Sequence, residues 1–285
     1  MSNFETFETA WCPGCGNHSI LECLKTALEE LGKNPHEVLM MAGIGQAAKT
    51  PQYISAHTFC GLHGRSLPPA QAAKIANSDL TVIVETGDGD SYGEGGNHFV
   101  HAVRRNVNIT HFVHDNQIYA LTKGQASPTT TEGQVTEVQP TGSHNSSFNP
   151  LLMAISAGAG FVARAFSGEK EHLVEIMKKA ILYDGYALVD IYQPCVSFNK
   201  INTFAYYKQR VYKLGDDYNR FDKIGAMQKA MEPDSKIPIG IIYEEKKTTF
   251  HQKNEVLTNC AKSGVSLART KQDLSLVQRY IDELR

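Results

Sequence analysis

The sequence predicts an α/β protein with a mostly parallel central sheet flanked by helices, followed by a C-terminal extension. Two observations lead to this prediction. Four short apolar segments have the length of buried strands and end at glycine, proline, acidic or amide residues; they are 38–42, 80–85, 109–114 and 186–192. Helix-like segments lie between them, at 70–77, 95–105 and 169–182. Alternation of this kind is typical of βαβ units on a buried parallel sheet.

The first helix is expected over residues 18–32. Ile20, Leu24 and Leu28 recur at helical spacing, and Gly32 is a typical residue for the helix end. Residues 1–200 are expected to form one domain that carries the functional residues. Residues 201–285, with the strand-like IPIGIIY segment, are expected to form an extension packed on that same domain.

Composition excludes several classes of protein. Hydrophobic residues make up 41% of the chain and charged residues 20%, with a formal net charge of −2. Lysine and arginine are scattered, so no basic face for nucleic acid is expected. No apolar run reaches the roughly 18–20 residues that span a bilayer, and the first residues lack the pattern of a secretory signal. We therefore expect a cytoplasmic protein with neither a membrane nor a nucleic acid partner.

Two acidic and amide motifs follow neighbouring strands. Asp88 lies in a GDG turn, between Gly87 and Gly89, and Asn116 follows the next strand 28 positions later, the length of one βαβ unit. The carboxyl ends of parallel strands meet at one edge of the sheet, so both side chains are expected there. Carboxylate, amide and carbonyl oxygens suit Mg²⁺, and the glycines let the backbone approach a diphosphate. The alternative is that both motifs are only tight turns between strands.

A cysteine pair lies near the N-terminus. Cys12 and Cys15 form a CxxC motif, and Cys195 lies in the loop after the last predicted core strand. Such a pair can bind zinc or an iron–sulfur cluster, or act as a redox disulfide. A zinc ribbon needs a second pair, which the sequence lacks, and a thioredoxin-like pair would follow a strand. We expect the three cysteines to meet in space.

Together these segments resemble the β subunit of 2-oxoacid:ferredoxin oxidoreductases. The resemblance is carried by WCPGCGNHSI, GIGQAAK, LHGRSLPPAQAAKIAN, TGDGDSYGEGGNH, DNQIYALTKGQASPT and QPCVSFN. These motifs cover about residues 8–200, in order, and are most similar to the 2-oxoglutarate type, which is shorter and simpler than the pyruvate type. The resemblance implies the thiamine-diphosphate-binding fold.

The resemblance also implies the residues of the cofactor site. Asp88, Asn116 and the backbone of Ile118 match the magnesium ligands. The residues implied to bind thiamine diphosphate are Ile44, Gly45, Gln46, Ala47, His63, Gly87, Gly89, Asp90, Ala120, Leu121 and Thr122. Lys123 is implied to attract the substrate carboxylate or coenzyme A, or else is a solvated loop lysine. His63 is the second implied catalytic residue, and its alternative is a loop histidine with protein partners.

Cys12, Cys15 and Cys195 match ligands of a [4Fe-4S] cluster in the family. A fourth cysteine usually stands where this chain has Gln46. Three outcomes are open: Cys60 replaces it, a group other than cysteine completes the cluster, or the cluster is labile or absent.

The implied reaction is coenzyme-A-dependent oxidative decarboxylation of a 2-oxoacid on thiamine diphosphate. Electrons then pass through the cluster to ferredoxin. The resemblance implies an α subunit that supplies the activating glutamate, in an αβ or α₂β₂ assembly. Two alternatives are a non-redox thiamine-diphosphate-dependent decarboxylase subunit, which needs no cysteine site, and a zinc-stabilised binding module, which needs no magnesium site.

Overall fold

An eight-stranded sheet forms the centre of the structure, which is a computed structural model describing residues 4–271 and 273–284. The strand order is β2-β1-β3-β4-β6-β5-β8-β7, and only the β5–β8 pair is antiparallel. The strands are β1 (Val38–Ala42), β2 (His57–Cys60), β3 (Thr81–Gly87), β4 (Ile109–Asp115), β5 (Phe161–Phe166), β6 (Tyr186–Tyr192), β7 (Val211–Lys213) and β8 (Ile237–Glu244). The predicted α/β class and mostly parallel sheet are confirmed.

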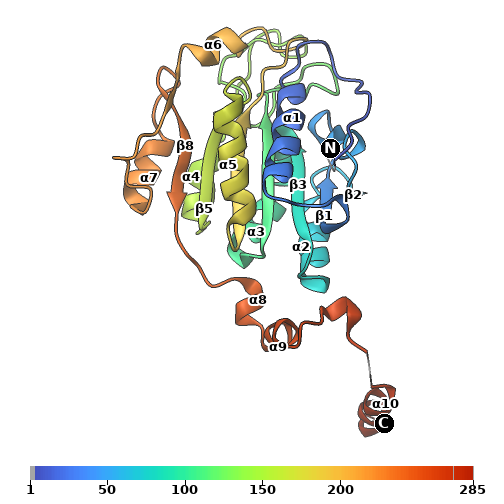
Figure 1. Ribbon diagram of the computed structural model, residues 1–285. Helices are drawn as coiled ribbons and strands as arrows, with labels where there is room; N and C mark the ends of the chain where they lie inside the picture. Colours follow the sequence, from blue (N-terminus) through green and yellow to red (C-terminus); the bar gives the residue numbers. More distant parts are fainter. Residues whose placement is uncertain (1–3, 272, 285) are drawn as a thin grey trace.

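Helices cover both faces of the sheet (Figure 1). One face carries α1 (Gly16–Glu30) and α5 (Lys170–Leu182), which pack against each other. The opposite face carries α2 (Leu67–Ala76), α3 (Gly96–Arg105), α4 (Pro150–Ser156) and α7 (Lys223–Ala230). Alternate strand residues enter the two cores: Met40 packs on the α1 and α5 side, and Met41 on the α2 and α3 side.

The first helix follows the predicted pattern closely. Ile20, Leu24 and Leu28 are fully buried against the sheet, and Gly32 adopts a left-handed φ of 65° just past the helix end. The helix begins at Gly16, two residues earlier than predicted. This early start places Cys15 at the N-terminal boundary of α1, next to the loop that follows β6.

The remaining α-helices are α6 (Phe204–Lys208), α8 (Phe250–Lys253), α9 (Glu255–Ser263) and α10 (Leu274–Glu283). The short helical turns are η1 (Pro35–Glu37), η2 (Ala47–Gln52), η3 (Gly89–Glu94) and η4 (Leu267–Arg269). β7 and β8 extend the sheet at one edge, whereas α8, α9 and α10 run away from β8 past one end of it (Figure 1). The side chains of α10 are all exposed. No helix in the described ranges is long and apolar enough to cross a membrane.

Candidate active site at the carboxyl edge of the sheet

A cavity of about 130 Å³ lies beyond the carboxyl ends of β1, β3 and β4. It is lined by every residue that the resemblance implied for binding thiamine diphosphate or magnesium. These residues are Ile44, Gly45, Gln46, Ala47, His63, Gly87, Asp88, Gly89, Asp90, Asn116, Ile118, Ala120, Leu121 and Thr122. β3 pairs directly with β4, which is why the GDG turn and Asn116 meet despite their separation in sequence. The structure adds Tyr119 to the lining.

Asp88 is buried and held by two hydroxyl groups. Its Oδ2 accepts hydrogen bonds from Ser127 Oγ at 2.5 Å and from Thr129 Oγ1 at 2.6 Å. Burial raises the pKa of Asp88 to about 6, although the two hydroxyl groups oppose that shift. The hydroxyl groups fix the carboxyl while leaving its Oδ1 without a side-chain donor. Sequence reasoning missed both residues, although they lie inside the DNQIYALTKGQASPT motif.

A second carboxyl continues this network. Thr129 Oγ1 also lies 2.8 Å from Oδ1 of Asp115, the last residue of β4. One hydroxyl group has one proton, so it cannot donate to both carboxyls at once. Burial, with the nearby Asp190 and Asp88 carboxyls, raises the pKa of Asp115 well above its usual range. Thr129 therefore donates to one carboxyl at a time, and a proton on Asp115 would direct the Thr129 proton at Asp88.

Asp90 joins the loops that follow β1 and β2. Its Oδ1 accepts hydrogen bonds from the backbone N–H groups of Ile44 at 3.0 Å and Gly64 at 2.7 Å. A Cβ atom on Gly43 would lie 1.9 Å from Asp90 Oδ2, so this approach requires glycine at position 43. Asp90 therefore shapes the cavity wall by binding protein backbone, in addition to lining the space.

His63 is anchored by a glutamate. Its Nδ1 lies 3.0 Å from Glu94 Oε2, and the Tyr119 hydroxyl donates to the same oxygen at 3.1 Å. A Cβ atom on Gly89 would lie 2.2 Å from the Tyr119 ring, so that ring packs directly on the GDG turn. Glu94 thus holds one side of His63 and leaves its Nε2 toward Asp90, at 3.9 Å.

The loop after β4 is closed on itself. Asn116 Oδ1 accepts from the backbone N–H of Ile118 at 3.0 Å, and Gln117 takes a left-handed φ of 58°. The backbone N–H of Tyr119 donates to the carbonyl of Gln125 at 2.8 Å. Lys123 stands at the exposed tip of this loop with a φ of 73° and does not line the cavity.

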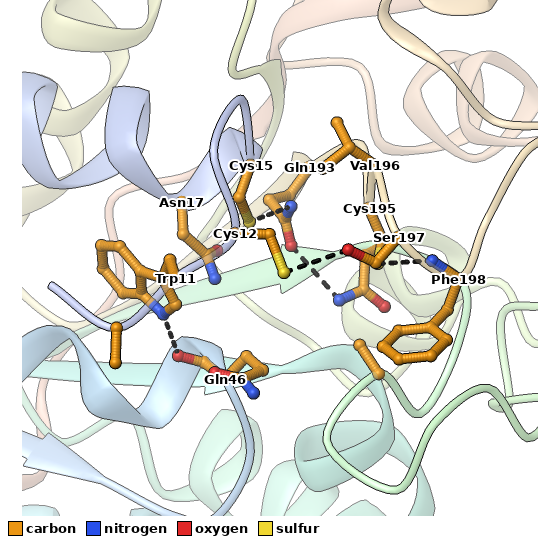
Figure 2. Close-up of a pocket in the computed structure, with 13 residues that line it drawn as sticks. Trp11, Cys12, Cys15, Asn17, Gln46, Gln193, Cys195, Val196, Ser197 and Phe198 are labelled. Atoms are coloured by element: carbon orange, nitrogen blue, oxygen red, sulfur yellow. Dashed lines mark hydrogen bonds between the residues drawn. The ribbon is translucent and has the colours of Figure 1, made fainter.

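A smaller cavity of about 40 Å³ adjoins the first and contains three cysteines (Figure 2). Cys12, Cys15 and Cys195 line it together, as the sequence predicted. Each sulfur accepts a hydrogen bond: Ser197 Oγ donates to Cys12 at 3.0 Å, Gln193 Nε2 to Cys15 at 3.4 Å and the backbone N–H of Phe198 to Cys195 at 3.5 Å. Donors aimed at sulfur are typical of sites that hold anionic sulfur.

Cys15 lacks the lowered pKa that is typical of a redox CxxC thiol. All six cysteines are free, and burial raises the pKa of Cys15 to about 11, whereas redox CxxC pairs lower it. Within the described ranges, no three or more His, Cys, Asp or Glu side chains converge closely enough to hold one metal ion.

Cys60 lies away from this pocket. It ends β2 at the edge of the sheet, is exposed, and its Sγ donates to the carbonyl of Gly43 at 3.2 Å. Gln46 does line the pocket; its backbone carbonyl accepts from Trp11 Nε1 at 2.9 Å, and its side-chain Oε1 is buried without a partner. The structure therefore brings Gln46, and not Cys60, to the three cysteines.

Comparison with known proteins agrees with this geometry. Residues 37–191 match the family profile described as "Thiamine pyrophosphate enzyme, C-terminal TPP binding domain". Residues 195–259 match the profile for the C-terminal part of the pyruvate ferredoxin oxidoreductase β chain. The chain is 45% identical, over 85% of its length and 84% of the relative's, to a 2-oxoacid:ferredoxin oxidoreductase subunit beta from Saccharolobus solfataricus. This chain is a 2-oxoacid:ferredoxin oxidoreductase β subunit.

Further β-subunit relatives and a solved structure extend this assignment. The 2-oxoglutarate oxidoreductase subunit KorB of Mycobacterium tuberculosis is 43% identical, over 67% of this chain and 52% of that protein. A solved 2-oxoglutarate:ferredoxin oxidoreductase from Magnetococcus marinus, with 2-oxoglutarate, coenzyme A and succinyl-CoA bound, matches with a TM-score of 0.90 at 34% identity. That match covers 98% of this chain and 96% of the other. The predicted family and fold are confirmed.

Proposed function

We propose that this β subunit binds Mg²⁺–thiamine diphosphate and an iron–sulfur cluster, and serves a coenzyme-A-dependent oxidative decarboxylation of 2-oxoglutarate that reduces ferredoxin. One observation carries the proposal. The larger cavity, called the diphosphate cavity below, and the three-cysteine pocket share Gln46, Asn116 and Ala120 as lining residues. A non-redox decarboxylase subunit has no use for a sulfur-lined pocket against its cofactor. The names of the relatives support 2-oxoglutarate as the substrate.

The residues present fit Mg²⁺ and a diphosphate. Asp88 contributes a carboxylate oxygen, Asn116 an amide oxygen and Ile118 a backbone carbonyl, all oxygen ligands of the kind that Mg²⁺ prefers. The GDG turn presents backbone without side chains at Gly87 and Gly89. When bound, thiamine diphosphate supplies the electron sink for loss of carbon dioxide.

The residues also fit a cluster, with one ligand unassigned. Cys12, Cys15 and Cys195 offer three sulfurs, each with a hydrogen-bond donor. Thiolate sulfurs are the usual ligands of an iron–sulfur cluster. Gln46 also lines the pocket, and its buried side-chain oxygen has no partner among the described residues, so it would be a candidate for the fourth ligand. A bound cluster supplies one-electron chemistry.

His63 and Lys123 are proposed to act on the substrate, His63 through a proton and Lys123 through its charge. His63 lines the cavity, and Glu94 fixes its Nδ1, so its Nε2 is the atom available to hold or exchange a proton. Lys123 follows the lining residue Thr122 at the exposed loop tip, where its charge can attract a substrate carboxylate or coenzyme A.

The site is proposed to be complete only with an α subunit. Activation of thiamine diphosphate in this family uses a glutamate against the pyrimidine ring, and among the described residues no glutamate lines the cavity. Glu85, the buried glutamate of β3, is instead bound to His114 Nε2 at 2.7 Å. We propose an αβ or α₂β₂ assembly that receives the 2-oxoacid and coenzyme A and passes electrons to ferredoxin.

The test is anaerobic purification of the chain with its α subunit, followed by iron and zinc analysis, visible absorbance and calorimetry with Mg²⁺–thiamine diphosphate. We expect iron with sulfide, charge-transfer absorbance and cofactor binding. Cofactor binding without iron would establish the decarboxylase alternative instead. Zinc without cofactor binding would establish a zinc-stabilised module.

A further inference from the structure

The side chain of Gln193 lines the three-cysteine pocket (Figure 2). It is hydrogen bonded to Cys15 and to Asn116, which lines both cavities. Its Oε1 accepts from Asn116 Nδ2 at 3.2 Å, and its Nε2 donates to Cys15 Sγ at 3.4 Å and to the carbonyl of Pro194 at 2.8 Å. Gln193 is only 1% exposed, so water does not compete for these bonds. A single amide thus connects a proposed magnesium ligand to a proposed cluster ligand.

The orientation of this amide is fixed by its neighbours. If Oε1 and Nε2 were exchanged, two N–H₂ groups would face each other at Asn116, and two oxygens would face each other at Pro194. The backbone N–H of Gln193 donates to the carbonyl of Asp115 at 2.9 Å. A Cβ atom on Gly16 would lie 2.9 Å from Gln193 Cγ, so the glycine after Cys15 makes room for this side chain.

We propose that Gln193 couples the two sites, so that the charge on the sulfur-bound group and the affinity for Mg²⁺–thiamine diphosphate influence each other. This inference rests on the proposed function. Reduction of the proposed cluster would make its cysteine sulfurs more negative, which would strengthen the N–H···S hydrogen bond from Gln193 to Cys15. Polarisation along the chain then strengthens the bond from Asn116 and makes the Asn116 oxygen a better metal ligand. Reduction therefore raises cofactor affinity, and by reciprocity bound cofactor raises the reduction potential.

Two variants separate coupling from simple loss of a sulfur hydrogen bond. Gln193→Met removes the donor to Cys15 and the link to Asn116 together, while keeping the volume of the side chain similar. Ser197→Ala removes the donor to Cys12, and Ser197 makes no hydrogen bond to Asn116 in the described structure. Each variant therefore loses one hydrogen bond to a sulfur, but only Gln193→Met also loses the hydrogen bond to Asn116.

The experiment uses the purified complex with its α subunit, freed of thiamine diphosphate. Calorimetry measures the affinity for Mg²⁺–thiamine diphosphate in the oxidised state and after reduction with dithionite. We expect the wild-type complex to bind about fivefold more tightly when reduced, the low end of ordinary coupling. Ser197→Ala should keep this ratio, and Gln193→Met should bring it close to one. Gln193→Glu, which keeps an acceptor for Asn116 but lacks the amide donor, should also lose it.

Potentiometry provides a second measurement of the same quantity. A fivefold ratio corresponds to a rise of about 40 mV in the midpoint potential on cofactor binding for a one-electron couple. An unchanged ratio in Gln193→Met and Gln193→Glu, or its loss in Ser197→Ala, would overturn the coupling, as would a wild-type ratio of one. Absence of iron from the wild-type complex would instead overturn the proposed function.

Discussion

At the scale of single residues, the site depends on polar groups that are buried and fixed. Asp88 is 1% exposed, yet its carboxyl is oriented by Ser127 and Thr129. Burying such a group is tolerable because each hydroxyl replaces a hydrogen bond lost from water. The arrangement holds the oxygen of the proposed metal ligand in place before any ligand arrives, which lowers the free-energy cost of ordering it on binding.

Replacing Asp88 with alanine should abolish detectable binding of Mg²⁺–thiamine diphosphate. We expect at least about a hundredfold loss of affinity, or about 2.7 kcal/mol, since a charged ligand of the metal disappears. Ser127→Ala should lose about tenfold, because it leaves the carboxylate but removes one hydroxyl that orients it. Calorimetry on variants that keep the wild-type circular dichroism tests both. Wild-type affinity in folded Asp88→Ala would refute the metal site.

A buried histidine should make stability depend on pH. His111 Nε2 lies 2.8 Å from Thr86 Oγ1, its Nδ1 lies 2.7 Å from the Tyr186 hydroxyl, and burial lowers its pKa to about 3. The unfolded chain, with a histidine pKa of about 6.5, binds this proton first as pH falls. The contribution of neutral His111 is therefore complete above pH 6.5 and is lost as pH falls from 6.5 toward 3.

Unfolding by urea at pH 7 and pH 5 measures this effect. His111→Gln should reduce the slope of unfolding free energy against pH by up to about 1.4 kcal/mol per pH unit, even though the variant is less stable at pH 7. His57→Gln, at an exposed position of β2, should keep the wild-type slope. Identical slopes in the wild-type protein and both variants would show that His111 does not contribute to the pH dependence of stability.

At the scale of elements, parallel strands bring the functional loops together. The loops after β1, β3, β4 and β6 carry Gln46, Asp88, Asn116 and Cys195, and all four reach the same edge of the sheet. β2 also points its end toward that edge, but it is the outermost strand. Its last residue, Cys60, is therefore displaced sideways and bonds to the Gly43 carbonyl instead.

This placement predicts different outcomes for two cysteine variants. After anaerobic reconstitution, Cys195→Ser should lose most of its iron and the paramagnetic signal of the reduced cluster, because a ligand sulfur is removed. Cys60→Ser should keep both, because Cys60 stands outside the pocket. Loss of iron in Cys60→Ser would show that Cys60 is a ligand after all. If neither variant loses iron, the three-cysteine site is wrong.

At the scale of the whole molecule, we propose that the chain provides one wall of an active site. The diphosphate cavity is open at the exposed side chains of Ile44 and Leu121. Relatives of this chain are named as β subunits, which agrees with a role inside a larger assembly.

The isolated chain should therefore bind Mg²⁺–thiamine diphosphate but turn over no 2-oxoacid with ferredoxin or a viologen as acceptor. The reason is that the activating glutamate is proposed to come from the α subunit. Addition of purified α subunit should restore coenzyme-A-dependent reduction of the acceptor. Activity of this chain alone, after removal of any partner, would refute the assembly.

The sequence by itself determined the elements whose signals are local. The strands at 38–42 and 186–192 match β1 and β6 residue for residue, because an apolar run of strand length is bounded by turn-forming residues. The nearness of the GDG turn to Asn116 was also predictable, because one βαβ unit fixes the distance between them, whereas the other lining residues were implied by the resemblance. Both signals lie within a few tens of residues of chain.

Only the tertiary structure decided features that depend on distant partners. β2 has four exposed residues and β5 contains the buried Arg164, so neither carries a clear strand pattern, and their places follow from pairing with β1 and β6. The same holds for the link from Asn116 through Gln193 to Cys15, which joins three segments far apart in the chain. Hydrogen bonds of this kind form where folding brings polar groups into contact, and no local periodicity records them.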